Sequence, residues 1–203
     1  MFKTKLKNIL FKETFSSMST AKSLALVGVF TALSVVANVF SIDVSPSLKI
    51  SFLYFFGFFC GAIFGPLVAF AICFLGDLLA FLIPVFSSGI YWLPTGICSG
   101  LLGFIPGLVF TSLKFKFRGG VFVKTAISVL ATYVLVTLLA GALSNYYYVK
   151  FVVFAGREYQ KTFIAYLGAK ILFSSIVSAL NYALIFATIP VFNSIKSIGF
   201  KIE

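Results

Sequence analysis

The stretch ISFLYFFGFFCGAIFGPLVAFAICFLGDLLAFLIP, residues 50–84, contains a single charged side chain, that of Asp77. Gly65 and Pro66 divide the stretch into two apolar runs, and proline is favoured in the first turn of a helix. A helix needs about 20 apolar residues to cross a bilayer. We therefore predict a hairpin of two membrane helices that are joined by a tight turn at Gly65 and Pro66.

Apolar runs of similar length lie on both sides of this hairpin. Hydrophobic residues make up 61% of the 203 residues and charged residues 10%, whereas soluble domains carry about 25% charged residues. A soluble chain of this length has too little interior to bury so much apolar surface. The sequence therefore predicts an all-α membrane protein, a bundle of about six transmembrane helices that forms one integral membrane domain over residues 1–203. The helices are expected at residues 21–40, 50–64, 66–84, 95–113, 123–144 and 163–190, with longer outer connections at 84–94 and 145–162.

Lysine and arginine are unevenly distributed among the predicted connections. If the N-terminus lies inside, most of these cations fall in cytoplasmic segments, and the outer connections hold only Lys49, Lys150, Arg157 and Lys161. The positive-inside rule then places both termini in the cytoplasm. Anionic lipid head groups explain the net charge of +11, so nucleic acid is not an expected partner.

Asp77 is the only acid in the middle of a predicted span. A charge within the membrane is costly unless it is paired, which makes Asp77 a candidate functional residue. At about 1.5 Å per residue, Asp77 and Lys170 of the last helix fall at nearly the same depth, about 10 Å below the outer surface. Two interpretations stay open: an Asp77–Lys170 ion pair that only joins two helices, or side chains that contact a polar ligand.

Polar side chains continue along the last helix from Lys170. Ser174, Ser178 and Asn181 follow at spacings of three or four residues, which place them on one face. Hydroxyl and amide groups gain nothing from facing lipid, so we predict that this face points into the bundle. Together with the acid described above and with Asn38 of the first helix, it outlines a polar cavity that opens to the outside.

Several residues of the outer connections are candidate ligand contacts. Lys49, Arg157 and Lys161 would attract an anionic ligand at the mouth of the cavity, although each is also compatible with an ordinary solvated charge. Tyr91 and Trp92 would either stack on a flat ligand or anchor the chain at the membrane interface.

The first predicted helix has two chemically different faces. One is polar, suits a pocket, and consists of Thr31, Ser34, Asn38 and Ser41. The other carries small residues at spacings of three and four, which allow another helix to approach closely, within the bundle or from a partner protein. This small-residue stripe consists of Ala21, Ala25, Gly28 and Ala32.

The sequence lacks the parts that common catalytic sites need. It has no histidine, no Gly-x-x-x-x-Gly-Lys-Ser/Thr loop for ATP, and no cluster of acids for a metal. Cys60, Cys73 and Cys98 lie within apolar segments, where cysteine behaves as a small apolar residue. We therefore expect no catalysis, no cofactor and no metal.

Four short motifs resemble those of one transporter family. They are Lys49-Ile50-Ser51-Phe52, Gly61-Ala62-Ile63-Phe64-Gly65-Pro66-Leu67, Gly76-Asp77-Leu78-Leu79 and Gly89-Ile90-Tyr91-Trp92-Leu93-Pro94. Over roughly residues 21–110 the chain is similar to the substrate-binding S-components of energy-coupling factor (ECF) vitamin transporters, and most similar to the folate-type branch. Branches for other vitamins share the glycine motifs, so pantothenate or a queuosine precursor stays open as the cargo.

The resemblance implies a six-helix S-component in the bacterial cell membrane that captures folate from the outer side. It also implies that the small-residue stripe docks onto a membrane T-subunit, which two cytoplasmic ATPases drive. In a folate site, Tyr91 and Trp92 would stack on the heterocycle, and Asp77 would bind its ring nitrogens. Lys170 and the basic residues at the mouth would meet its carboxylates. The alternative from another class is a non-transport membrane protein without a small-molecule ligand.

Overall fold

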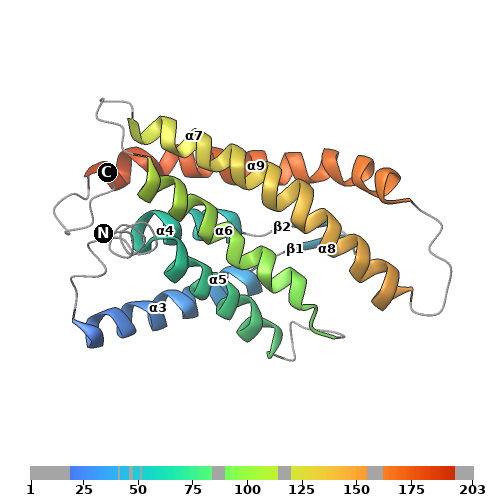
Figure 1. The fold of residues 1–203 in the computed structure, drawn as a ribbon, viewed down its shortest axis with the longest axis horizontal. Helices are drawn as coiled ribbons and strands as arrows, with labels where there is room; N and C mark the ends of the chain where they lie inside the picture. Colours follow the sequence, from blue (N-terminus) through green and yellow to red (C-terminus); the bar gives the residue numbers. More distant parts are fainter. Residues whose placement is uncertain are drawn as a thin grey trace, which may run out of the picture.

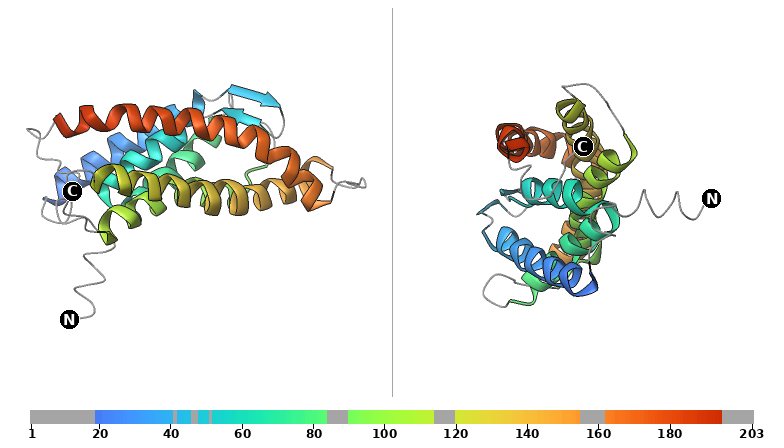
Figure 2. Two further views of the ribbon diagram at one scale, coloured as in Figure 1. Left: turned by 90° about the horizontal axis from the view of Figure 1, so that it is seen from above. Right: turned by 90° about the vertical axis from the view of Figure 1, so that its left-hand side faces the viewer.

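The computed structural model describes residues 19–40, 42–45, 48–50, 52–83, 90–113, 120–154 and 162–194. Within these ranges the chain forms six helical segments packed into one bundle (Figures 1 and 2). Five are α3 (Thr20–Val39), α4 (Leu53–Phe64), α5 (Pro66–Phe81), α6 (Leu93–Ser112) and α9 (Phe163–Ser194). The sixth runs without a break through α7 (Gly120–Thr132), η1 (Tyr133–Ala140), α8 (Gly141–Tyr148) and η2 (Val149–Val153), where η1 and η2 are π-helical.

Four of the six segments are long and apolar enough to cross a membrane, namely α3, α6, the segment from α7 to η2, and α9. The remaining two, α4 and α5, are shorter apolar helices. The prediction of an all-α membrane bundle is confirmed. The start of α3 and the end of α9 lie at the same end of the bundle (Figure 1). That this end faces the cytoplasm stays a prediction from the charge distribution.

Two regions have a secondary structure that was not predicted. The helix expected at residues 123–144 continues to Val153, because no glycine or proline interrupts the chain after Gly141 until Gly156. Tyr147 and Phe151, one turn apart, stack with their ring centroids 5.7 Å apart. Part of the predicted outer connection 145–162 is therefore helical.

The second difference is a short hairpin between α3 and α4. Strand β1 (Ile42–Ser45) pairs antiparallel with β2 (Leu48–Ile50), and Asp43 lies opposite Lys49. Strand β2 contacts α9. The predicted second helix consequently begins at Leu53 rather than at residue 50.

The predicted turn between α4 and α5 is confirmed. Gly65 adopts a φ of 87°, which side chains other than that of glycine rarely allow, and Pro66 begins α5. Helix α6 packs tightly against this turn, since a Cβ atom on Gly107 would lie 2.6 Å from the Pro66 nitrogen. The small residues of α6 thus let α4, α5 and α6 form the most closely packed part of the bundle.

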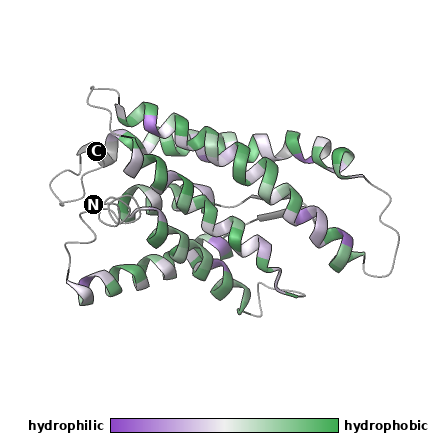
Figure 3. Cartoon of the chain, viewed as in Figure 1, coloured by the Kyte–Doolittle hydropathy of each residue, from purple (hydrophilic) through white to green (hydrophobic). Residues whose placement is uncertain are grey.

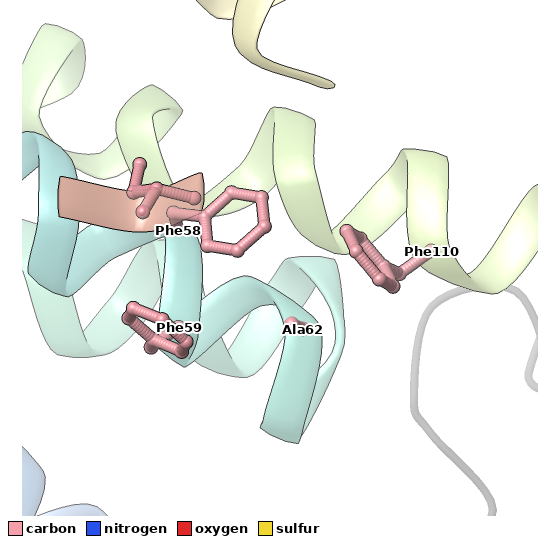
Figure 4. Close-up of a cluster of buried hydrophobic side chains, with 5 residues drawn as sticks. Phe58, Phe59, Ala62 and Phe110 are labelled. Carbon is pink, nitrogen blue, oxygen red and sulfur yellow. The ribbon is translucent and has the colours of Figure 1, made fainter. Parts of the chain in front are cut away.

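Aromatic side chains of α4 and of the C-terminal half of α6 pack together in the interior. Figure 4 shows Phe58, Phe59 and Ala62 of α4 with Phe110 of α6, and Ile185 of α9 completes the cluster. The rings of Phe58 and Phe110 meet edge to face with centroids 5.5 Å apart. This cluster joins α9 to the α4–α6 unit.

The exterior of the bundle is apolar and much of its interior is polar. Figure 3 shows that hydrophobic residues predominate in the helices. Leu24, Leu130 and Leu172 are each at least 66% exposed, whereas Ser34, Thr125 and other hydroxyl-bearing residues are buried. Such an arrangement suits lipid as the surrounding solvent.

Candidate functional site

Asp77 lies one turn before the end of α5, at the end of the bundle where α6 begins (Figure 1). Two hydroxyl groups donate to its half-buried carboxylate: Ser99 Oγ to Oδ1 at 3.0 Å, and Tyr91 Oη to Oδ2 at 3.2 Å. Carboxylate oxygens accept more than one hydrogen bond each. The two bonds fix the orientation of the acid between α5 and α6.

Tyr91 lies just before α6 and reaches Asp77 across Gly96. A Cβ atom on Gly96 would lie 2.1 Å from the Tyr91 hydroxyl, so the absence of a side chain there makes room for the tyrosine. Burial and the neighbouring carboxylate raise the pKa of Tyr91 to about 12. The tyrosine therefore keeps its proton at neutral pH and acts as a donor to Asp77.

We expect Gly96→Ala and Tyr91→Phe to be non-additive in their effects on the site. Gly96→Ala should displace the Tyr91 hydroxyl and lower the affinity of the site for the ligand that it is predicted to bind several-fold, at about 1.4 kcal/mol for each factor of ten. Tyr91→Phe removes the atom with which the new methyl group collides. The double variant should thus bind about as well as Tyr91→Phe alone, as measured in a double-mutant cycle. Additive losses would mean that Gly96 acts through something other than Tyr91.

Trp92 connects the start of α6 to α8. Its indole Nε1 donates to the Ser144 carbonyl at 3.1 Å, and its ring meets the edge of Tyr148 with centroids 6.1 Å apart. Thr95 and Ser144 add a hydroxyl–hydroxyl contact of 3.3 Å. The structure thus gives Trp92 an anchoring role within the protein, while stacking on a ligand stays a prediction.

Lys170 is the charged residue of α9 that was predicted to lie near Asp77. Its Nζ donates to the Gly141 carbonyl at 3.0 Å and lies 5.9 Å from the centre of the Tyr166 ring. Through this bond the ammonium contacts the long α7–η2 helix. The ion-pair interpretation stays a prediction beside the ligand-contact interpretation. Cys98 lies within electrostatic range of both charges.

The polar residues of α9 point inward, as predicted. Ser174, Ser178 and Asn181 are 8%, 2% and 3% exposed. On α3, Asn38 is also buried, and its amide donates to the Ser34 carbonyl at 3.1 Å. Both predicted polar faces therefore lie in the interior, as far as the structure describes them. Ser41 lies outside the described residues.

The α3 helix contacts the site through a close approach to α5. A Cβ atom on Gly76 would lie 2.2 Å from the Ser34 hydroxyl, so α3 and α5 meet directly beside Asp77. The small-residue stripe lies on the outward surface of α3: all four of its members are exposed, and a Cβ atom on Gly28 would meet nothing within 4 Å. Helix α3 thus has one face in the bundle, and its other, small-residue face is exposed in the described part of the chain.

A set of hydroxyl groups near the site was not predicted. The Thr137 hydroxyl donates to Tyr54 Oη at 3.3 Å, and the Tyr133 and Ser175 hydroxyls lie 2.5 Å apart. Tyr133 and Thr137 belong to the π-helical turn η1, a geometry that is frequent at functional sites. No sequence pattern distinguishes these residues, because their hydroxyls meet only through packing of α4, η1 and α9.

Three predicted basic contacts cannot be placed in the site. Arg157 and Lys161 lie outside the described residues, and Lys49 is described only as part of the backbone of β2. A metal centre has no basis in the part of the chain that is described, since no three His, Cys, Asp or Glu residues gather there.

Comparisons with known proteins agree with this architecture. The family model of the ECF-type riboflavin transporter S component matches residues 18–196. A solved structure, the crystal structure of FolT bound with folic acid, is 22% identical with a TM-score of 0.64, and the match covers 85% of this chain and 97% of that chain. That likeness shows the fold. No curated protein matches the chain. Because the family match spans nearly the whole chain, the protein belongs to the S-component family of ECF-type riboflavin transporters, which are substrate-binding membrane subunits.

Proposed function

We propose that this chain captures a vitamin from the outer side of the membrane through a charged layer, which we define as Asp77, Cys98 and Lys170 with the hydroxyls of Tyr91 and Ser99. The observation that carries the proposal is the pair of opposite charges within electrostatic range of one thiol, presented by α5, α6 and α9. Charges within a membrane bundle are costly and mark substrate or ion pathways.

The chemistry of the layer favours a flat, polar cargo. Ring N–H groups of a heterocycle would donate to Asp77, whose carboxylate Tyr91 and Ser99 already orient. Lys170 would exchange the Gly141 carbonyl for an acceptor on the cargo. Stacking on Tyr91 and Trp92 would add about 1 kcal/mol beyond burial. Asn38 and Ser174 would supply further hydrogen bonds, and the mouth would be lined by Lys49, Arg157 and Lys161.

Folate is the cargo that we propose first. Its carboxylates would meet Lys170 and the basic mouth, and both the motif resemblance and the fold shared with FolT support it. Riboflavin is the second candidate, because the family model that matches is that of a riboflavin transporter S component. Folate is anionic and riboflavin is neutral, so the two cargoes place different demands on the lysines.

Lys170→Met should reveal which cargo is bound. A hydrogen bond to a charged group is worth about 1.5–3 kcal/mol, so we expect a loss of about tenfold or more in affinity for folic acid. The loss for riboflavin should be smaller and independent of salt concentration, because no full charge pair is lost. Lys150→Met is the matched control, since Lys150 is an exposed outer lysine beside Phe151. Equal losses of affinity in Lys170→Met and Lys150→Met would show that Lys170 does not bind the cargo.

Transport would require energy from other proteins. The sequence has no ATP-binding loop, and the exposed small-residue stripe of α3 offers a surface for the close approach of a membrane partner. We propose an ECF T-subunit as that partner, with two cytoplasmic ATPases supplying the energy. The stripe would then be the docking surface, and the charged layer the capture site.

Titration of the purified protein with folic acid, riboflavin and pantothenate tests the proposal. We expect one vitamin to bind with a dissociation constant below about 1 µM, or about −8 kcal/mol. A queuosine precursor is tested in parallel, because the sequence analysis left it open as a further possible cargo. Failure of all four to bind, together with pull-downs from native membranes that recover no ATPase, would support a non-transport membrane protein instead.

A further inference from the structure

Four buried polar atoms of α7 and α9 lie away from the charged layer. They are Ser128 Oγ of α7 and Ser178 Oγ, Asn181 Oδ1 and Tyr182 Oη of α9, and none has a hydrogen-bond partner among the described residues. Ser128, Ser178 and Asn181 are at most 3% exposed. Buried polar groups in folded proteins are nearly always satisfied, by protein or by ordered water.

The packing of α7–η2 against α9 places these atoms at one level. The two helices are antiparallel, with Gly141 beside Lys170 and Tyr133 beside Ser175. When this register is continued toward the start of α7 and the end of α9, Ser128 lies at the same level as Asn181. Asn181 is about 16 Å further along the α9 axis than Lys170, at about 1.5 Å per residue. The four atoms therefore lie inward of the charged layer rather than within it.

The chemistry of the four atoms selects a neutral ligand. The Asn181 amide donates to the Val177 carbonyl at 3.0 Å, so its Oδ1, an acceptor, points away from that bond and would repel an anion. Lys124 lies one turn inward of Ser128 on the same face of α7, is 3% exposed, and would repel a cation. A hydroxyl group suits the site because it both donates and accepts hydrogen bonds.

Tyr182 connects this position to the hydroxyl groups nearer the charged layer. Its hydroxyl lies close to those of Ser178 and Thr137, yet the geometry forms a hydrogen bond with neither. Thr137 in turn donates to Tyr54, which lies near Cys98. A polar track thus runs from the charged layer to the inner half of the bundle.

We propose that Ser128, Ser178, Asn181 and Tyr182 form an inner binding site for hydroxyl groups, a second site beyond the charged layer. The hydroxyl comes either from resident water or from a hydroxylated part of the cargo that reaches inward. Both sources satisfy the same four atoms, and they differ in whether the cargo must be present. The proposal does not depend on which vitamin is carried.

Radiolytic hydroxyl-radical labelling of the full protein in nanodiscs tests this site. Radicals formed from bound water modify the side chains beside it, so in protein without vitamin Tyr182 should be labelled about tenfold faster than Phe58, which lies in the apolar cluster. The labelling is repeated in further samples, the other arms of the experiment, that contain riboflavin or folic acid. Unchanged labelling in these arms assigns the hydroxyl to resident water, and protection of Tyr182 by either vitamin assigns it to the cargo. Labelling of Tyr182 as slow as that of Phe58 in every arm would overturn the proposal.

Asn181→Leu provides an independent measurement. If the site is occupied, the variant should lower the melting temperature of the protein and slow the labelling of Tyr182, because the ligand loses an acceptor. If the site is dry, replacing an unsatisfied amide by an apolar side chain should raise the melting temperature, which would count against the proposal. Ser34→Ala is the matched control, since the Ser34 hydroxyl is buried without a partner but pressed against Gly76. It should leave the labelling of Tyr182 unchanged.

Discussion

Asp77→Asn is expected to weaken vitamin binding at least about tenfold, which corresponds to about 1.4 kcal/mol. The side chain keeps its shape but loses its charge. Its new NH₂ group would face either the Ser99 or the Tyr91 hydroxyl, both of which now donate to the carboxylate. Donors on the cargo would also lose a charged acceptor, and bonds of that kind are worth about 1.5–3 kcal/mol. Asp77→Ala should lower the vitamin affinity at least as much as Asp77→Asn.

The control for this prediction is Asp43→Asn, which removes an acid from the β1 strand and should change the affinity less than about twofold. Ser99→Ala should give an intermediate loss, because it removes one of the two donors that orient the carboxylate. Wild-type affinity in a folded Asp77→Asn protein would show that the cargo binds elsewhere.

Gly28→Trp is expected to abolish assembly with the energising partner while leaving vitamin affinity unchanged. Gly28 is exposed and a side chain there meets nothing within 4 Å, so the isolated protein should fold normally. A partner helix that packs on the small-residue stripe needs close contact between backbones, which an indole ring prevents. Recovery of the T-subunit and ATPases in pull-downs should fall about tenfold or more, in line with the loss of the packing that drives helix association.

Leu33→Trp is the matched control for the stripe. Leu33 is 46% exposed on α3 but lies to one side of the stripe, so the same indole ring should face lipid there. Full recovery of the partner with Gly28→Trp would exclude the stripe as the docking surface. If both variants failed to recover the partner proteins, the cause would be a general effect of a bulky side chain on α3.

The fold was predictable because the local composition of the sequence indicates where membrane helices lie. Apolar runs and the Gly65–Pro66 step each act within a few residues, and the structure has the helices and the turn that they predict. The β1–β2 hairpin was not predicted, since strands of three or four residues have almost no periodicity. Asn145 and the tyrosines after it resemble a loop by composition, but nothing in that stretch stops a helix.

The site was only partly predictable, since its residues meet through packing. Asp77 was identified because an acid in an apolar run is rare, and the inward face of α9 because its polar residues recur at helical spacing. The Gly141 carbonyl that binds Lys170 carries no sequence signal, because every residue has a carbonyl group. The role of Gly96 likewise depends on where Tyr91 lies in three dimensions.

A structure of the protein with its vitamin bound tests the capture site most directly. We predict polar atoms of the vitamin within hydrogen-bond distance of both Asp77 and Lys170, with the Lys170–Gly141 bond replaced by a contact to the cargo. A vitamin bound away from this layer, with Lys170 still on the Gly141 carbonyl and Asp77 bonded only to protein, would contradict the account.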